Sequence, residues 1–336
     1  MSLQYLVDDI DTLLSKLEAG EHVDIPEELY EEFGKVCADS LRRQMRPQVT
    51  PSRGTVRMSN LGRPDRILYY EVNHPEEKEK LESHARIRFA YGDMIEALVL
   101  FLMEASGNAI DNKQARIQIK SSAGNTGTTI KGSCDGSSRG TVFDIKSASS
   151  YAYNTKFAKG GLELDDPFGY RFQLGAYKAG ELKKKSVLNN ADDIESVESI
   201  RDGGIINLPW DISSGHSDTR QPAFVVIDKS DGRLKITEPS IPSTLEVKER
   251  IEHVMRVLDE PTPPTRCHAP IPKGNKGNMI LPKPCGWCDF KQFCHKDAND
   301  GAGLRTFEYS TYKGKEPTYF TKVVDEPRVK EITNDT

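Results

Sequence analysis

The sequence contains no apolar run close to the roughly 20 residues that a membrane-spanning helix needs. Its first residues, MSLQYLVDDIDTLL, carry acids where a secretory signal has basic residues and an unbroken apolar stretch. It also has no G-x-x-x-x-G-K-[ST] segment, so we expect no ATP site of its own. These absences predict a soluble protein of the cytoplasm that has no membrane partner.

A strong excess of charge of either sign is also missing. The formal net charge is -5, which argues against a protein that coats nucleic acid nonspecifically but leaves room for a locally basic groove. The six cysteines are too few and too clustered for a disulfide framework in a reducing compartment. We therefore interpret the clustered cysteines as metal ligands.

The pattern along the 336 residues predicts an α/β protein with four regions. We expect an N-terminal helical module at 1–50, a core at 51–260, a cysteine segment at 261–300 and a tail at 301–336. Helical spacing and alternating β-branched residues place the main elements of the core. The expected helices cover 84–107, 166–185 and 243–260, and the expected strands cover 115–122, 128–136, 141–149 and a hairpin at 223–236.

The strongest basic segment is RRQMRPQVTPSRGTVRMSNLGRPDRILYY, which spans residues 42–70 and has almost no acids. A solvated linker would explain most such runs. The run ends in Tyr69 and Tyr70, and aromatic residues beside arginines are typical of phosphate-binding surfaces. Both interpretations stay open at this point.

Two acids and a lysine lie close together in KGSCDGSSRGTVFDIKSASS. Residues two apart on a strand share a face, so Asp144 and Lys146 point together while Phe143 and Ile145 face the core. A hairpin partner that carries Asp135 would bring a second carboxylate beside them. Two carboxylates and a backbone carbonyl, which we assign to Ile145, form an incomplete Mg²⁺ site, and the lysine suits an attacking water. The set predicts phosphodiester hydrolysis.

An acid two residues before a lysine occurs at five other places in this chain, so the tripeptide alone discriminates nothing. Asp144 differs by its apolar strand and by polar residues on the flanking helices. Glu96 interrupts an apolar stretch of the first helix, and Gln173 and Tyr177 are spaced i, i+4 on the second. Each residue alone is better explained as a surface or capping residue. Their combination in this order favours a site.

The order GDMIE, GSCD, DIK and QLGAY resembles the PD-(D/E)XK nuclease superfamily, and the glutamine-x-x-x-tyrosine element is similar to its RecB-like branch, which includes CRISPR-associated and phage exonucleases. The resemblance covers roughly residues 55–295. It implies a restriction-endonuclease-like core, in which helices flank a mixed central β-sheet. The N-terminal helical extension and a C-terminal metal-bound cysteine segment would be attached to that core.

The resemblance also implies the roles of the catalytic residues. Asp135 and Asp144 would bind a catalytic Mg²⁺ or Mn²⁺, and Lys146 would assist the nucleophilic water. Glu96 stands where many RecB-like members carry histidine as a further metal ligand.

Further positions match elements that contact the nucleic acid. Gln173 and Tyr177 would organise the site and contact the DNA strand. MSNLGRPDRILYY resembles the helix that opens the nuclease domain, which makes Arg63 and Arg66 candidate phosphate contacts.

The second constellation is C-x17-C-x2-C-x5-C, formed by Cys267, Cys285, Cys288 and Cys294. Four thiols can close a tetrahedral site for zinc or hold an iron–sulfur cluster. The last three resemble the 4Fe–4S triplet of RecB-like exonucleases of the AddB and CRISPR-associated type, which favours 4Fe–4S and keeps Zn²⁺ as the alternative. Those relatives carry the fourth cysteine in a CPR element, where this chain has RPDR, so Cys267 would replace it.

Other residues complete the expectation for the cysteines. His268 and His295 are possible substitute ligands, whereas Cys37 and Cys134 are expected to be packing residues.

We therefore expect a metal-dependent DNA exonuclease that acts on linear single- or double-stranded DNA. The resemblance suggests phage DNA processing, recombination or degradation in the bacterial host cytoplasm, with recombination or replication proteins as possible partners. Two alternatives remain: an endonuclease subunit of a recombination or integration complex, and a catalytically inactive nucleic-acid-binding module.

Overall fold

The chain folds as a mixed α/β protein, as the sequence predicts at this coarse level. The computed structural model describes residues 2–47, 53–80, 84–121, 128–183, 205–206, 220–311 and 314–332. Two compact units divide the chain. The first comprises Met1–Gln48, Val56–Gly62 and Glu82–Met255, and the second comprises Val49–Thr55, Arg63–Leu81 and Arg256–Thr336. The four predicted regions stay a prediction.

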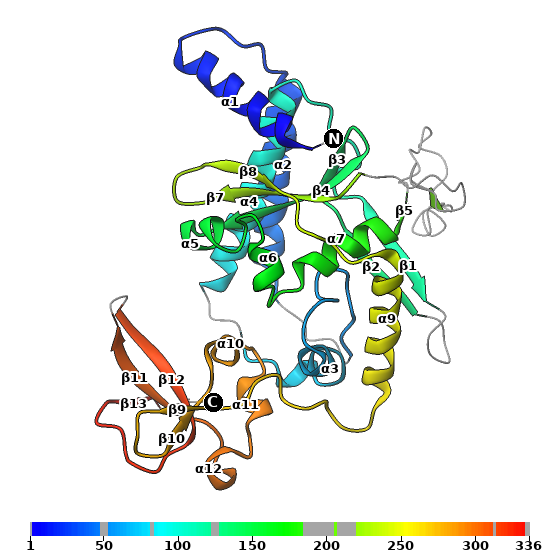
Figure 1. The fold of residues 1–336 in the computed structure, drawn as a ribbon. Helices are drawn as coiled ribbons and strands as arrows, with labels where there is room; N and C mark the ends of the chain where they lie inside the picture. Colours follow the sequence, from blue (N-terminus) through cyan, green and yellow to red (C-terminus); the bar gives the residue numbers. More distant parts are fainter. Residues whose placement is uncertain are drawn as a thin grey trace. The chain divides into compact units, whose positions relative to one another are not determined.

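The first unit contains helices packed on two sheets (Figure 1). Its helices are α1 (Gln4–Glu18), α2 (Glu27–Gln44), α4 (Ala85–Ala105), α5 (Ser150–Asn154), α6 (Gly161–Leu164), α7 (Tyr170–Ala179) and most of α9 (Thr244–Asp259). Its strands are β1 (Arg116–Ser121), β2 (Thr128–Ser133), β3 (Gly136–Ser138), β4 (Thr141–Ala148), β5 (Glu181–Lys183), β6 (Ile205–Ile206), β7 (Ala223–Asp228) and β8 (Leu234–Thr237).

One sheet has the strand order β3-β4-β7-β8 and is mixed, because β4 pairs in parallel with β7 while the outer pairs are antiparallel. The other sheet has the order β2-β1-β5-β6 and is antiparallel. The sequence predicts that the strand at 128–136 pairs with the strand at 141–149. The structure differs, because β2 ends at Ser133 and pairs with β1, and the separate short strand β3 pairs with β4.

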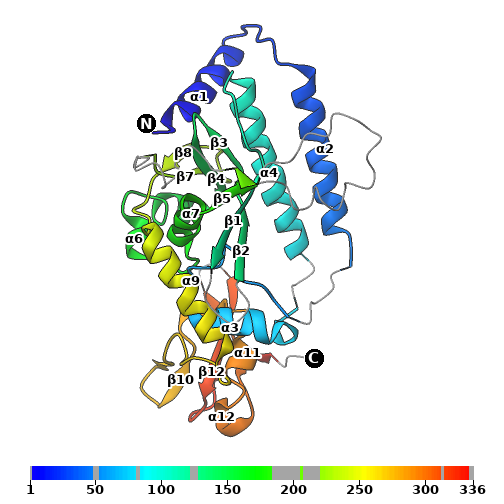
Figure 2. The ribbon, with the colours of Figure 1, turned by 90° about the vertical axis from the view of Figure 1, so that its right-hand side faces the viewer.

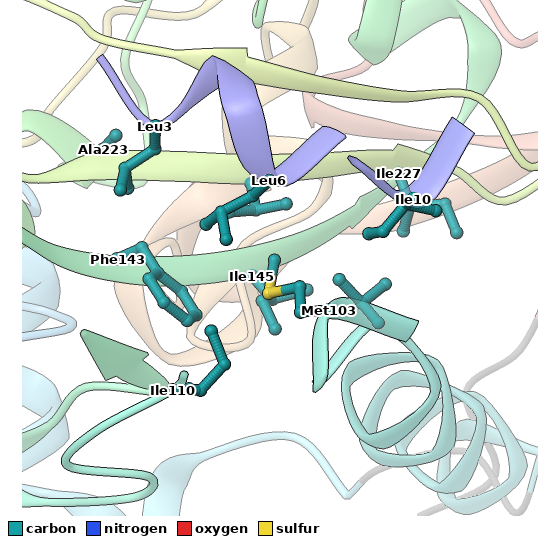
Figure 3. Packing of buried hydrophobic residues seen from close by; sticks show 11 residues of the cluster. Leu3, Leu6, Ile10, Met103, Ile110, Phe143, Ile145, Ala223 and Ile227 are labelled. Carbon is teal, nitrogen blue, oxygen red and sulfur yellow. The ribbon is translucent and has the colours of Figure 1, made fainter. Parts of the chain in front are cut away.

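The mixed sheet carries the main core of the unit. All six residues of β7 are buried, as in a strand whose two faces are both covered. On one face, α1 and α4 pack their apolar side chains against the strands (Figure 3). The buried cluster on this face consists of Leu3, Leu6, Ile10, Val99, Met103, Ile110, Phe143, Ile145, Ala223, Val225 and Ile227.

The opposite face of the mixed sheet is covered by α5, α6 and α7 (Figure 1). Here the ring of Phe224 lies 6.0 Å from that of Phe157 and 5.6 Å from that of Tyr170. Asp144 is paired in register with Phe224 on the neighbouring strand. The alternation of β4 therefore directs Asp144 toward these helices and Phe143 and Ile145 toward the core, as predicted.

The N-terminal helices belong to this unit. Helix α1 contributes to the core of the mixed sheet through its buried apolar side chains. Helix α2 packs along α4 (Figure 2), where Asp93 Oδ2 accepts from Ser40 Oγ at 2.6 Å and from Arg43 Nη2 at 3.0 Å. Two helices thus form before residue 50, where the sequence predicts a helical module. The sequence does not show that they pack on the sheet, because an amphipathic pattern identifies the apolar face of a helix but not the surface that covers it.

The second unit contains small helices and an antiparallel sheet of the order β13-β11-β12-β10-β9. Its helices are α3 (Asp65–Asn73), the 3-10 helix η1 (Pro75–Glu77), α10 (Lys283–Gly286), α11 (Lys291–Cys294) and α12 (Ala298–Gly301). Its strands are β9 (Ile271–Lys273), β10 (Asn278–Ile280), β11 (Arg305–Thr311), β12 (Gly314–Lys322) and β13 (Glu331–Ile332). None of the described helices combines the length and the apolar composition that a membrane crossing requires.

Candidate functional site

The hairpin β3–β4 brings two acidic residues together. The turn between its strands is formed by Arg139 and Gly140, which both have positive φ, as in a two-residue turn of type I′. Gly136 pairs with Phe143, so Asp135 directly precedes the last pair of the ladder on the side of Asp144. The two carboxylates come from opposite strands of one hairpin, as the sequence predicts.

Both carboxylates are buried and fully engaged in contacts. Asp135 is 8% exposed and Asp144 is 3% exposed. The backbone N–H of Ile145 donates to Asp135 Oδ2 at 2.6 Å. Asp144 Oδ1 forms an ion pair with Lys146 Nζ. Asp144 Oδ2 accepts from Gln173 Nε2 at 2.7 Å.

Helix α7 supplies the partners of Asp144 through two residues one turn apart. Gln173 Nε2 also donates to the Tyr177 hydroxyl at 2.8 Å. That hydroxyl lies 2.6 Å from Ser133 O and 3.1 Å from Asp144 Oδ2, and its single proton serves one of them at a time. Burial, and then the charge of Asp144, raise the pKa of Tyr177 well above its usual range, so the hydroxyl stays protonated.

The start of α7 is fixed by capping and by close packing. The Asp166 carboxylate accepts from the backbone N–H groups of Tyr170 and Arg171, each at 2.9 Å. Gly169 lies directly against Gly62, since a Cβ on Gly62 would come within 2.5 Å of the Gly169 Cα. These contacts set the position from which Gln173 reaches Asp144.

Lys146 is enclosed by aromatic rings as well as by Asp144. Its Nζ lies 5.2 Å from the ring centroid of Tyr170 and 5.6 Å from that of Phe224. Burial lowers the pKa of the ammonium, but Asp144 outweighs this effect and raises it above its ordinary value. Lys146 is therefore a cation at neutral pH and can act as a proton donor or as a charge, not as a base.

Glu96 reaches the same site from α4. Gln114 Nε2 donates to Glu96 Oε1 and, at 3.3 Å, to Asp135 Oδ1, so one amide bridges the two carboxylates. Burial, and then the charges of Asp144 and Asp93, raise the pKa of Glu96 to about 7. Burial, and then Asp144 and Glu96, raise the pKa of Asp135 well above its usual range. Glu96 and Asp135 thus each hold a proton more tightly than usual, because they are buried and negative charges lie close to them.

The structure thus brings together Glu96, Asp135, Asp144, Lys146, Gln173 and Tyr177, which the sequence selects as site residues. Ile145 has its side chain in the core and its N–H on Asp135, and the role of its carbonyl stays a prediction. Gln114 was not foreseen. It lies in the polar loop DNKQA, and no pattern in one sequence marks an amide that will bridge two carboxylates.

The four predicted cysteine ligands lie in the second unit, and their thiols interact. Burial, and then Cys288, Cys267 and Cys294, raise the pKa of Cys285 to about 12. Burial is also the main cause that raises the pKa of Cys288 to about 11, with Cys294 and Cys267 contributing. All four are free cysteines. A cation bound among the four sulfurs would favour their ionised form.

The histidines near the cysteines differ in environment. His295 is buried, and burial followed by Arg266 lowers its pKa to about 4, so its ring is neutral at physiological pH. His268 is exposed. Arg266 donates to the Cys294 carbonyl oxygen from Nη2 at 3.0 Å. Away from this cluster, Cys134 is buried as expected of a packing residue.

Arg66 lies at the cysteine cluster. Its Nε donates to Cys294 Sγ at 3.2 Å, another of its nitrogens donates to Pro264 O, and its guanidinium carbon is 5.1 Å from the Tyr70 ring centroid. Arg63 pairs with Glu71 at 2.6 Å. Both arginines thus have protein partners, and their phosphate contacts stay a prediction.

In the described part of the chain, no three His, Cys, Asp or Glu side chains already stand as a group that could hold a metal ion. The donor chemistry nevertheless fits two different cations. Carboxylate oxygens gathered at one place suit Mg²⁺ or Mn²⁺, and a set of four thiols suits zinc or an iron–sulfur cluster.

Comparison with known proteins gives little. No family model matches the chain, and no curated protein matches its sequence. Among solved structures, the crystal structure of SSO0001 aligns over 78% of this chain and 95% of that chain, with 14% identity and a TM-score of 0.39. A similarity at this level carries no argument about fold or function.

Proposed function

We propose that the protein is a metal-dependent DNA nuclease of the PD-(D/E)XK superfamily, in its RecB-like branch, and that it acts as an exonuclease on linear DNA. The observation that supports this proposal is the convergence of Glu96, Asp135 and Asp144 with Lys146 beside strand β4 of the mixed sheet. Carboxylates that are ionised and buried together repel one another, and a divalent cation bound between them would offset that repulsion.

The proposed site assigns a role to each of its residues. Glu96, Asp135, Asp144 and the Ile145 carbonyl would hold Mg²⁺ or Mn²⁺, which supplies Lewis-acid stabilisation of charge on a phosphoryl group. Lys146, a cation under these conditions, would orient the attacking water and stabilise charge that develops on phosphorus. Gln173 and Tyr177 hold Asp144 in place and would meet the DNA strand.

The four cysteines would hold a second, structural group in the other unit. We infer a 4Fe–4S cluster, with Zn²⁺ as the alternative, bound by Cys267, Cys285, Cys288 and Cys294. A short turn links two of them, since the Cys288 N–H donates to Cys285 O at 3.1 Å, and the Cys294 N–H donates to Phe290 O at 2.8 Å. Such a group would order the segment around α10 and α11.

A time course on end-labelled linear DNA and closed circular DNA, with Mg²⁺ or with EDTA, tests the activity. We expect the linear DNA to shorten from an end only with metal. Lys146→Ala should slow cleavage about 100- to 1000-fold and leave DNA binding nearly unchanged, because the lost group acts on developing charge. Lys156→Ala is the matched control, since Lys156 lies on the same unit and pairs with Asp165.

The outcomes separate the candidate functions. Nicking of the closed circle would indicate the endonuclease, which works as part of a larger recombination complex. DNA binding without metal-dependent cleavage of either substrate would indicate the inactive binding module. Full cleavage by Lys146→Ala would remove the lysine from the mechanism.

A further inference from the structure

The loop before β1 has an unusual backbone. Asn112 and Gln114 both have positive φ, at 55° and 54°, a conformation that is strained for an L-residue other than glycine. Asparagine tolerates it well, but glutamine does not share that tolerance. A loop that keeps a strained glutamine needs contacts that hold it in place.

Contacts on both sides fix this loop. Asp111 and Ser137 exchange two backbone hydrogen bonds of 2.8 Å, and Asn112 Nδ2 donates to Ser137 Oγ at 2.9 Å. Lys113 Nζ donates to the carboxylate of Glu32 on α2 at 2.7 Å and to that of Glu104 on α4 at 3.1 Å. Two helices and strand β3 thus determine where residue 114 stands.

The result is that Gln114 faces the carboxylates. Its backbone N–H donates to Asp135 O at 3.3 Å, and its side-chain amide donates to both Glu96 and Asp135. Gln114 itself is exposed, so water could satisfy its amide without these carboxylates. The contact is therefore explained by its effect on the positions of Glu96 and Asp135, and not by a requirement to satisfy the hydrogen bonds of the Gln114 amide.

We propose that Gln114 is a positioning residue that holds the Glu96 and Asp135 carboxylates side by side for a divalent cation. The inference rests on the proposed function, because it assigns a support to the same metal site. Two carboxylates repel each other and separate when nothing lies between them. An amide with two donor hydrogens bridges them and still leaves lone pairs on each carboxylate for the cation.

The experiment compares Gln114→Gly with Asn112→Gly in the full chain. Both changes relieve the same strained φ, but only the first removes the amide that touches the carboxylates. Mn²⁺ alone is the probe, its affinity is measured by titration calorimetry, and melting temperature reports on folding. We expect Gln114→Gly to bind Mn²⁺ roughly 10- to 100-fold more weakly with a melting temperature at or above that of the wild type. Asn112→Gly should bind within about twofold of the wild type, because it leaves the Gln114 amide in place and the backbone pair of Asp111 and Ser137 still holds the loop.

Cleavage gives an independent readout. Saturating Mn²⁺ should restore the rate of Gln114→Gly to near the wild-type value, since the catalytic groups are intact and only metal occupancy has fallen. Unchanged Mn²⁺ affinity in Gln114→Gly would overturn the inference while the proposed function stands. A wild-type chain that binds no Mn²⁺, or binds it equally well after Asp144→Ala, would overturn the proposed metal site itself.

Discussion

The carboxylates of the site should make the metal-free protein less stable as the pH rises, and Glu96→Gln isolates that effect. Burial, with the charges of Asp144 and Asp93, raises the pKa of Glu96 from its ordinary 4.5 to about 7. In the unfolded chain Glu96 ionises near 4.5, while in the folded chain it keeps its proton until about pH 7. The stabilisation from this group is therefore complete below pH 4.5 and lost as the pH rises to 7.

The magnitude follows from the size of the pKa difference. Each tenfold change in a protonation equilibrium is worth about 1.4 kcal/mol, so a rise from 4.5 to about 7 corresponds to about 3 kcal/mol. Glutamine has nearly the same shape and stays neutral at every pH. Near pH 4 the variant and the wild type should have the same free energy of unfolding. Above pH 7 the free energy of unfolding of the variant should be higher by about 3 kcal/mol.

Urea unfolding of both chains in EDTA, from pH 4 to 8, measures this difference. Groups away from the site titrate alike in both proteins, so they cancel when the two curves are subtracted. Asp135, whose pKa is raised by burial, by Asp144 and by Glu96, adds to the difference in the same direction. Mg²⁺ at pH 8 should stabilise the wild type and have less effect on the variant, which lacks one carboxylate ligand. A difference curve that stays flat from pH 4 to 8 would refute the reasoning, because Glu96 would then titrate as an ordinary surface glutamate.

Two further predictions concern packing and the cysteines. Elemental analysis of the purified chain should find a bound metal, and Cys288→Ser should remove it. Arg66→Ala should lower metal retention about 10- to 100-fold, because it removes the hydrogen bond to a ligand sulfur. Full metal content in both variants would contradict the four-thiol site. Urea unfolding should show that Gly62→Ala destabilises the protein by about 1–3 kcal/mol, because the new Cβ would clash with the Gly169 Cα. Gly34→Ala is the control: Gly34 lies in a helix with open space around it, so this change should stabilise the protein by about 0.5–1 kcal/mol.

Local sequence patterns predicted much of the site. Strand alternation placed Asp144 opposite to Phe143 and Ile145, and the i, i+4 spacing on α7 brought Gln173 and Tyr177 to one carboxylate. These inferences succeeded because each depends only on the geometry of a single element. A hairpin that ends in the strand at 141–149 was also predicted, although its first strand is β3 and not the predicted strand at 128–136.

Inferences that depend on which surfaces meet were less accurate. The sequence could not show that β2 pairs with β1 rather than with β4, because both strands offer similar β-branched patterns. Nor could it show that Arg66 meets a cysteine sulfur, since the two residues are 228 positions apart. Gln114 is the clearest case. Its contacts to Glu96 and Asp135 depend on a strained φ and on the neighbouring Lys113, which ties the loop to two helices, and no local pattern records this.

The charge balance of the site bears on how many cations it would take. The three carboxylates carry a formal charge of -3 when ionised and Lys146 carries +1, which leaves -2 on Glu96, Asp135, Asp144 and Lys146 together. The amides and the tyrosine hydroxyl stabilise these anions but cannot cancel their charge, so in the metal-free protein protons must do so. One divalent cation would bring the sum to zero. A second divalent cation would leave the buried site with a charge of +2 unless a DNA phosphate entered with it. We therefore expect the free protein to bind one catalytic metal ion, and any second metal ion to bind together with the substrate.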